Sequence, residues 1–203
     1  SCGLLPIGER KVHFFDGASD WVDPNRRTTL MFSAVFLDRD GTIIRDVGYL
    51  SRPSDVDLLP GSLEALCEMS GAGLPLVLVS NQSGIGRGLI SEEQAGLVHR
   101  RLEDLLAEAD VCFAAAYYCP HHPKERCRCR KPGTGLLEKA SVDLNIDLVT
   151  SAMVGDRVSD AQAGTRSGCR AILIDPMRTA HPSAWRTVPD LASAAEIVVR
   201  GRQ

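Results

Sequence analysis

Five short apolar runs alternate with stretches of helical spacing along the chain, and this alternation limits the folds open to it. The runs are typical of strands that are buried on both faces of a parallel sheet, and they cover residues 34–37, 76–79, 114–118, 151–154 and 171–174. Helices are predicted over residues 61–70, 91–109, 134–144, 161–167 and 191–199, the second opened by a Ser91–Gln94 capping box. Strands that alternate with helices predict a doubly wound α/β fold with a mostly parallel sheet, in which ligands bind beyond the carboxyl ends of the strands.

The 203 residues are expected to form one domain over residues 33–203, preceded by an N-terminal extension over residues 1–32. The extension mixes glycine, proline and charged residues without a sustained period, so no role is assigned to it. Hydrophobic residues make up 44% of the chain and charged residues 24%, which is the composition of a folded domain and not of a disordered one.

Charge and hydropathy argue against several kinds of partner. The net charge of −3 is not that of a protein that coats nucleic acid by bulk electrostatics. No apolar run approaches the roughly 20 residues that a membrane span needs, so no membrane partner is expected. The first residues lack the basic region and apolar stretch of a secretory signal, which predicts a cytoplasmic protein. With no extra apolar helix or heptad repeat evident, a monomer is expected.

The first apolar run ends on two carboxylates, Asp38 and Asp40. Residues at i and i+2 of an extended chain project to the same side, so both carboxylates can face one reacting group. One can be a nucleophile toward phosphorus or a ligand for a hard cation such as Mg²⁺. The other can protonate a departing alkoxide and then activate water. A turn rich in aspartate after a strand is the alternative interpretation, and this motif alone does not exclude it.

Two further runs end on residues able to do chemistry, Ser80 and Asp156. Because the carboxyl ends of parallel strands meet at one edge of a sheet, these side chains and Asp38 are expected to form a single site.

Residues 119–129 hold three thiols and two imidazoles within eleven residues. Thiolates and imidazole suit tetrahedral Zn²⁺, and a closed set of three cysteines and one histidine is typical of a structural site. The expected ligands are Cys119, His121, Cys127 and Cys129, with His122 as a competing ligand and a run of reduced thiols as the alternative. Because the loop continues directly into Arg130 and Lys131, zinc is expected to rigidify it so that both cations meet a phosphate.

These motifs resemble those of the haloacid dehalogenase-like (HAD-like) phosphohydrolases, whose four motifs occur here in the family's order. The resemblance implies a phosphatase that forms an aspartyl-phosphate, with Asp38 as nucleophile and Asp40 as general acid and base. It implies that Ser80 hydrogen-bonds the phosphoryl group and that Lys131 neutralises its charge. It also implies a catalytic Mg²⁺ held by Asp38, by the backbone carbonyl of Asp40 and by Asp156 of the acidic motif, which includes Gly155 and Asp160.

Among the zinc-loop members of this family, the chain looks more like the D-glycero-D-manno-heptose 1,7-bisphosphate 7-phosphatases than the histidinol-phosphate phosphatases. The matching segments are residues 36–43, 48–49, 81–88, 117–123 and 153–156. The resemblance implies that a small sugar phosphate is the substrate and that it contacts Asp46, Gly48, Tyr49, Asn81, Gln82, Ser83, Arg130 and Arg157. Residues 42–61 and 80–91 leave no room for an inserted cap domain, so an open site is expected.

Three hypotheses stay open, and a sugar-phosphate phosphatase is the first. Only five residues separate His121 from Cys127, which is closer to the histidinol-phosphate type, and Arg157 stands where a lysine is common. A phosphatase for histidinol phosphate or another small ester therefore remains an alternative. A zinc-stabilised binding module without catalysis is the third, and the intact pair of Asp38 and Asp40 argues against it.

Overall fold

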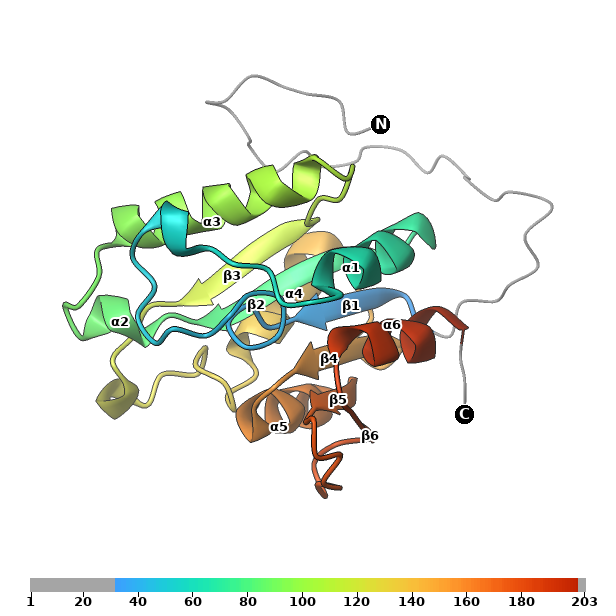
Figure 1. Ribbon diagram of the computed structural model, residues 1–203. Coiled ribbons are helices and arrows are strands. Elements are labelled where there is room, and N and C mark those ends of the chain that lie inside the picture. The colour runs from blue at the N-terminus through green and yellow to red at the C-terminus, as the bar shows by residue number, and fades with distance from the viewer. Residues whose placement is uncertain (1–31, 201–203) are drawn as a thin grey trace.

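The computed structural model describes residues 32–200, so the expected extension lies outside the described residues except for Phe32. Six strands form one sheet in the order β3-β2-β1-β4-β5-β6, and every pair of neighbours is parallel (Figure 1). Their bounds are Ala34–Leu37 (β1), Leu76–Asn81 (β2), Ala115–Cys119 (β3), Ser151–Gly155 (β4), Arg170–Ile174 (β5) and Arg186–Val188 (β6). The predicted parallel sheet is confirmed.

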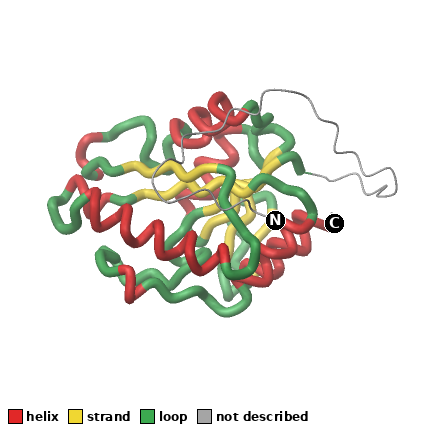
Figure 2. The backbone as a smooth tube through the Cα atoms, turned by 90° about the horizontal axis from the view of Figure 1, so that it is seen from above, coloured by secondary structure: helices red, strands yellow, loops and turns green. Residues whose placement is uncertain are grey.

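Helices cover both faces of the sheet, which confirms the doubly wound α/β class (Figures 1 and 2). Helices α1, α3 and α6 pack on one face and α4 and α5 on the other. The bounds are Ser62–Gly71 (α1), Ser83–Gly86 (α2), Glu92–Ala107 (α3), Gly135–Leu144 (α4), Val158–Ser167 (α5) and Leu191–Arg200 (α6), with short 3₁₀ turns at Pro53–Asp55 (η1) and Pro123–Glu125 (η2). Among the described residues, no helix is long and apolar enough to cross a membrane.

The central strand β1 shows why the apolar runs are continuous instead of alternating. Val35 and Leu37 belong to the core under α1, α3 and α6, whereas Phe36 belongs to the core under α4 and α5. Successive side chains of a strand point to opposite faces, so a strand with helices on both sides needs an apolar residue at every position. Phe32 extends the first core, where its ring meets Trp185 edge to face.

Two helix boundaries and two short elements illustrate where the structure differs from the prediction. Helix α3 ends at Ala107 and not Ala109, and α5 begins at Val158 and not Ala161. Strand β6 was not predicted, because only Val188 of its three residues is buried and one apolar position carries no period. Helix α2 was not predicted either, since two of its four residues are glycines. The capping box of α3 is confirmed: Gln94 N–H donates to Ser91 Oγ at 3.0 Å, and Ser91 N–H donates to Gln94 Oε1 at 2.8 Å.

The strand order reverses at β1, which pairs with β2 on one side and β4 on the other. Leu37 of β1 lies opposite Val154 of β4, so the residues that follow these two strands emerge side by side. Ligands of open parallel sheets bind in the crevice at such a switch point. The fold therefore directs attention to the residues just beyond β1, β2 and β4.

Candidate active site

A buried lysine lies against the first carboxylate beyond β1. Lys131 Nζ is 2.8 Å from Asp38 Oδ1 and 2.7 Å from Asp160 Oδ1, and it also donates to the Val79 carbonyl at 2.7 Å. Both Asp38 and Lys131 are buried, at 6% and 2% exposure. Burial opposes the charge of Lys131, but the facing carboxylates of Asp38 and Asp160 raise its pKa above the ordinary value. The lysine is therefore a fixed cation at the base of the crevice.

Three carboxylates converge at the same point. Asp38, Asp156 and Asp160 each offer an oxygen within 4.8 Å of the others. Burial and the charges of Asp38 and Asp160 raise the pKa of Asp156 to about 7. Three carboxylates facing one lysine leave excess negative charge, and oxygen donors of this kind suit Mg²⁺. The donor set thus fits a divalent cation.

Glycine at position 41 allows this close approach. Its φ of +85° lies in the left-handed region, and a Cβ there would overlap the Asp156 carboxylate. The turn after β1 can therefore pass directly over the end of β4. Thr42, the next residue, donates its hydroxyl to Asp156 Oδ1 at 3.3 Å.

The second carboxylate of the motif has different partners. The Asp40 carboxylate accepts hydrogen bonds from Nε and Nη2 of Arg39 at 3.0–3.3 Å and from Nε2 of Gln82 at 2.8 Å. Gln82 Nε2 also lies 3.0 Å from Ser80 Oγ, which links the ends of β1 and β2. Burial opposes the charge of Arg39, but Asp40 and Tyr118 raise its pKa above the usual value.

These groups line a pocket of about 300 Å³ at the carboxyl edge of the sheet. It contains the four residues expected to be catalytic and all eight expected to contact substrate: Asp38, Asp40, Ser80, Lys131, Asp46, Gly48, Tyr49, Asn81, Gln82, Ser83, Arg130 and Arg157. Asp156 is not in this lining and lies behind it, against Gly41 and Asp38. Ser159 and Asp160 line the pocket as well, although neither was expected to contact substrate.

Charged groups from distant segments meet in the pocket wall. Arg157 Nη2 lies 2.6 Å from Asp46 Oδ2, an ion pair between the loop after β1 and the start of α5. The other Asp46 oxygen accepts the Gly48 N–H at 2.8 Å. Arg130 Nη1 is buried and has no hydrogen-bond partner among the described residues. That donor is available to an anionic ligand.

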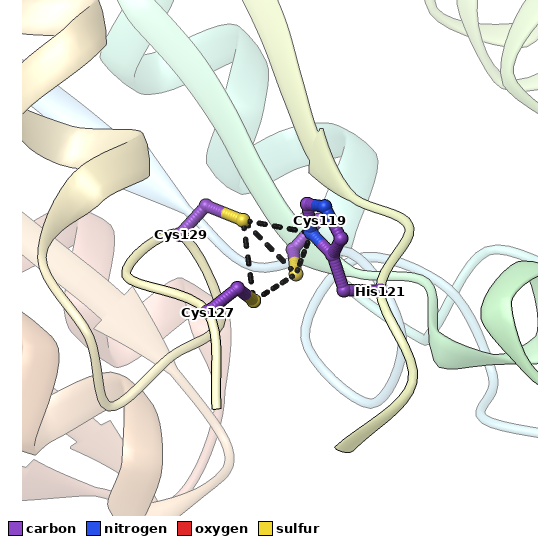
Figure 3. Close-up of side chains that lie close together, drawn as sticks. All are labelled: Cys119, His121, Cys127 and Cys129. Carbon is purple, nitrogen blue, oxygen red and sulfur yellow. Dashed lines mark hydrogen bonds between the residues drawn. The ribbon is translucent and has the colours of Figure 1, made fainter. Parts of the chain in front are cut away.

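The cysteine loop forms a second candidate metal centre (Figure 3). The Sγ atoms of Cys119, Cys127 and Cys129 lie 3.3–3.5 Å apart, and His121 Nδ1 lies 3.6 Å from Cys119 Sγ and 3.1 Å from Cys129 Sγ. Zn–S bonds of about 2.3 Å place the ligand atoms of a tetrahedron roughly 3.5–3.8 Å apart. The spacing is close to that value and too long for disulfides, so the four side chains fit zinc.

His122, the competing ligand, makes other hydrogen bonds. His122 Nδ1 accepts the Lys124 N–H at 3.0 Å, and the Glu125 carboxylate accepts the His122 N–H at 2.6 Å. These bonds cap η2 and leave His122 outside the cluster.

Known proteins share both the sequence and the fold. A D-glycero-beta-D-manno-heptose-1,7-bisphosphate 7-phosphatase of Photorhabdus laumondii is 45% identical over 139 residues, which is 65% of this chain and 74% of that protein. The protein of the same name from Haemophilus influenzae is 43% identical over 158 residues, 75% of this chain and 85% of the relative. Residues 128–188 match the family model described as HAD-hydrolase-like. The chain belongs to the HAD-like phosphatases.

A solved HAD-like phosphatase has the same architecture. The crystal structure of D,D-heptose 1,7-bisphosphate phosphatase from B. bronchiseptica, complexed with magnesium and phosphate, matches with a TM-score of 0.78 at 31% identity. The match covers 84% of this chain and all of that one. The resemblance expected from the motifs is thereby confirmed.

Asn81 has a use in this HAD-like phosphatase that the sequence did not reveal. Its Nδ2 donates to the Lys131 carbonyl at 3.1 Å, and its Oδ1 accepts the Lys131 N–H at 3.0 Å. The amide thus holds the backbone of Lys131 in the way a neighbouring strand would. Although Asn81 lines the pocket, both of its polar atoms already have protein partners.

Replacing Asn81 with alanine is expected to loosen Lys131. The loss of two partly buried hydrogen bonds should lower the free energy of unfolding by about 2 kcal/mol and the melting temperature by roughly 4–8 °C. Thermal unfolding followed by circular dichroism measures this. Ser83→Ala, which removes a hydroxyl from the same pocket, is the matched control and should melt like the parent. Equal melting temperatures for all three proteins would show that the contact contributes nothing.

Proposed function

We propose that this chain is a Mg²⁺-dependent phosphatase that hydrolyses the 7-phosphate of D-glycero-beta-D-manno-heptose 1,7-bisphosphate. The observation that carries the reaction is the buried contact of Asp38 with Lys131 at the base of a pocket lined by donors. The relatives of that name, each of which this chain covers over most of its length, support the substrate.

Asp38 is the proposed nucleophile in the first step. A carboxylate oxygen attacks phosphorus, the ester P–O bond breaks, and its electron pair stays on the sugar oxygen. Asp40 gives its proton to that oxygen, so the sugar leaves as an alcohol and an aspartyl-phosphate remains. Lys131 and the Ser80 hydroxyl face the equatorial oxygens, where negative charge is spread during the transfer.

Water completes the reaction in the second step. Asp40, now a carboxylate, takes a proton from a water molecule as that water attacks phosphorus. The bond between phosphorus and Asp38 breaks, which releases inorganic phosphate, restores the Asp38 carboxylate and leaves Asp40 protonated for the next cycle. The same side chain therefore serves as acid and then as base, in a position fixed by Arg39 and Gln82.

Two metals fit the donor sets described above. Asp38 and Asp156, with the backbone carbonyl of Asp40, would hold Mg²⁺, and Asp160 lies close enough to join them. When bound, this ion supplies positive charge that offsets the phosphoryl oxygens and the crowded carboxylates. Zinc would be held by Cys119, His121, Cys127 and Cys129, and its role is to fix the loop that carries Arg130 and Lys131.

The remaining pocket residues would bind the sugar and its second phosphate. Arg130, with a buried unpartnered nitrogen, suits a forked contact with phosphate. Asp46 presents carboxylate oxygens that can accept from hydroxyls, Gly48 lines the pocket beside it, and Tyr49 offers a ring that is 46% exposed. Asn81, Gln82 and Ser83 also line the pocket, and the exposed Arg157 pairs with Asp46.

A panel of phosphate esters tests this function. Phosphate release should be fastest from heptose 1,7-bisphosphate, slower from histidinol phosphate and simple sugar monophosphates, and abolished by chelation of Mg²⁺. The short stretch between His121 and Cys127 makes histidinol phosphate the second candidate. If the heptose bisphosphate turns over no faster than the simple esters, the proposed substrate is wrong. Release from none of them in the presence of Mg²⁺ would contradict the phosphatase itself.

A further inference from the structure

Arg39 lies between Asp38 and Asp40 in the sequence but does not line the pocket. Its side chain is 1% exposed, and its Nε and Nη2 atoms lie 3.0–3.3 Å from both oxygens of Asp40. A planar guanidinium that contacts both oxygens of a carboxylate fixes the plane of that group as well as its position. A single donor would leave the carboxyl group free to rotate.

A second donor reaches Asp40 from another strand. Gln82, just beyond β2, donates from Nε2 to Asp40 Oδ2 at 2.8 Å. Arg39 belongs to the turn after β1, so the carboxylate is held from two directions by two segments. Asp40 therefore has one defined orientation within the pocket.

Arg39 also lies against an aromatic ring that has its own hydrogen-bond partner. Its guanidinium carbon lies 5.8 Å from the centre of the Tyr118 ring, and the Tyr118 hydroxyl is 2.7 Å from Nδ1 of His99 on α3. Arg39 Nη1 is buried without a hydrogen-bond partner among the described residues. A buried ion pair with an unsatisfied donor is a poor source of stability. The effect of this arginine is therefore expected on the orientation of Asp40 and not on the stability of the fold.

We propose that Arg39 is a positioning residue that aims the Asp40 carboxyl group at the oxygen of the leaving group. The inference rests on the proposed function, because it concerns the proton that Asp40 transfers as the ester P–O bond breaks. An alkoxide needs that proton in order to leave, since it is strongly basic. A nitrophenolate leaves without it, because its charge is spread over the ring.

Two substrates of similar shape separate this role from a general structural one. Benzyl phosphate has an alkoxide leaving group, and 4-nitrophenyl phosphate has a stable one. The quantity to compare is kcat/KM, which covers the steps up to departure of the leaving group and not the later hydrolysis of the aspartyl-phosphate. For Arg39→Met we expect kcat/KM to fall about 10²-fold with benzyl phosphate and less than about threefold with 4-nitrophenyl phosphate.

Matched variants make the result interpretable. Arg45→Met breaks an exposed Arg–Asp pair in the same loop, where Arg45 meets Asp57 at 2.9 Å, and should leave both rates unchanged. Arg39→Lys keeps the charge but cannot contact both oxygens of Asp40 with a planar group. Its kcat/KM should fall less than that of Arg39→Met, with the same preference for the nitrophenyl ester. If Arg39→Met does not fold, as judged by its melting curve, Arg39→Lys alone decides the question.

Equal losses with the two esters, or no loss, would overturn the positioning role. A parent protein that hydrolyses neither ester nor the heptose bisphosphate would contradict the proposed function instead, so the two failures can be told apart.

Discussion

Asp38→Asn is expected to abolish phosphate release, with a fall in kcat of about 10⁴-fold or more, as loss of a nucleophile does in other enzymes. The amide has nearly the same shape but no negative oxygen to attack phosphorus. Because Lys131 keeps Asp160 as a partner at 2.7 Å, the variant should still fold. Initial rates with heptose bisphosphate at saturating Mg²⁺ give the measurement, and a melting curve checks the fold.

A matched control separates the loss of the Asp38 carboxylate from the general effect of removing one negative charge. Asp57→Asn removes an exposed carboxylate, paired only with Arg45 among the ion pairs seen in residues 32–200, and should leave the rate unchanged. Phosphate release by Asp38→Asn at the parent's rate would show that another group attacks phosphorus. Its neighbour Asp40 would then be the first alternative to examine.

The second large effect is expected at the cysteine cluster. Cys127→Ser removes one of four ligands, so the protein should lose the roughly one zinc per chain that we expect after dialysis. A structural zinc contributes directly to folding, and a loss of about 3 kcal/mol in a domain of this size lowers the melting temperature by roughly 6–12 °C. Phosphate release should fall by up to about 10²-fold, since small displacements of a positioning group are costly. Metal analysis, melting curves and initial rates measure the three effects.

Cys112→Ser provides the same substitution outside the cluster, at an exposed position of the loop before β3. It should retain the metal and the activity. A Cys127→Ser protein that keeps zinc and melts with the parent would contradict a structural site. Loss of zinc with unchanged activity would mean that the contacts of Lys131 with Asn81, Asp160 and the Val79 carbonyl hold it in place without the metal.

Sequence was a reliable guide wherever a feature repeats along the chain. Five of the six strands were predicted because each contains a run of apolar residues. In β1 this run is buried on both faces, as Val35, Phe36 and Leu37 illustrate, whereas most of β3 is only half-buried. The edge strand β6 was missed because Val188 is the only apolar residue among its three, so nothing in its composition distinguishes it from a turn. Local signals such as the Ser91 capping box depend only on near neighbours and were predicted correctly.

The members of the candidate site were easier to predict than their contacts. All eight residues expected to contact substrate line the pocket, because motifs at the ends of adjacent strands must meet there. The hydrogen-bond partner of each side chain depends on segments that are far away in the sequence. Asn81 binds the backbone of a residue 50 positions later, and Gln82 reaches back 42 positions to Asp40. The same holds for Asp160, whose contact with Lys131 no local pattern reveals.

The tip of the peptide between His121 and Cys127 is more exposed to solvent than the segments on either side of it. Residues 124–126 at its tip are exposed, whereas Cys119 before it is buried and Lys131 after it is tied to Asn81. Insertions and deletions at this tip can therefore be absorbed without moving the lysine that contacts Asp38. Relatives can differ in the length of this segment, and in what they admit to the pocket, while keeping the same catalytic apparatus. Selectivity and chemistry can evolve separately in such an enzyme.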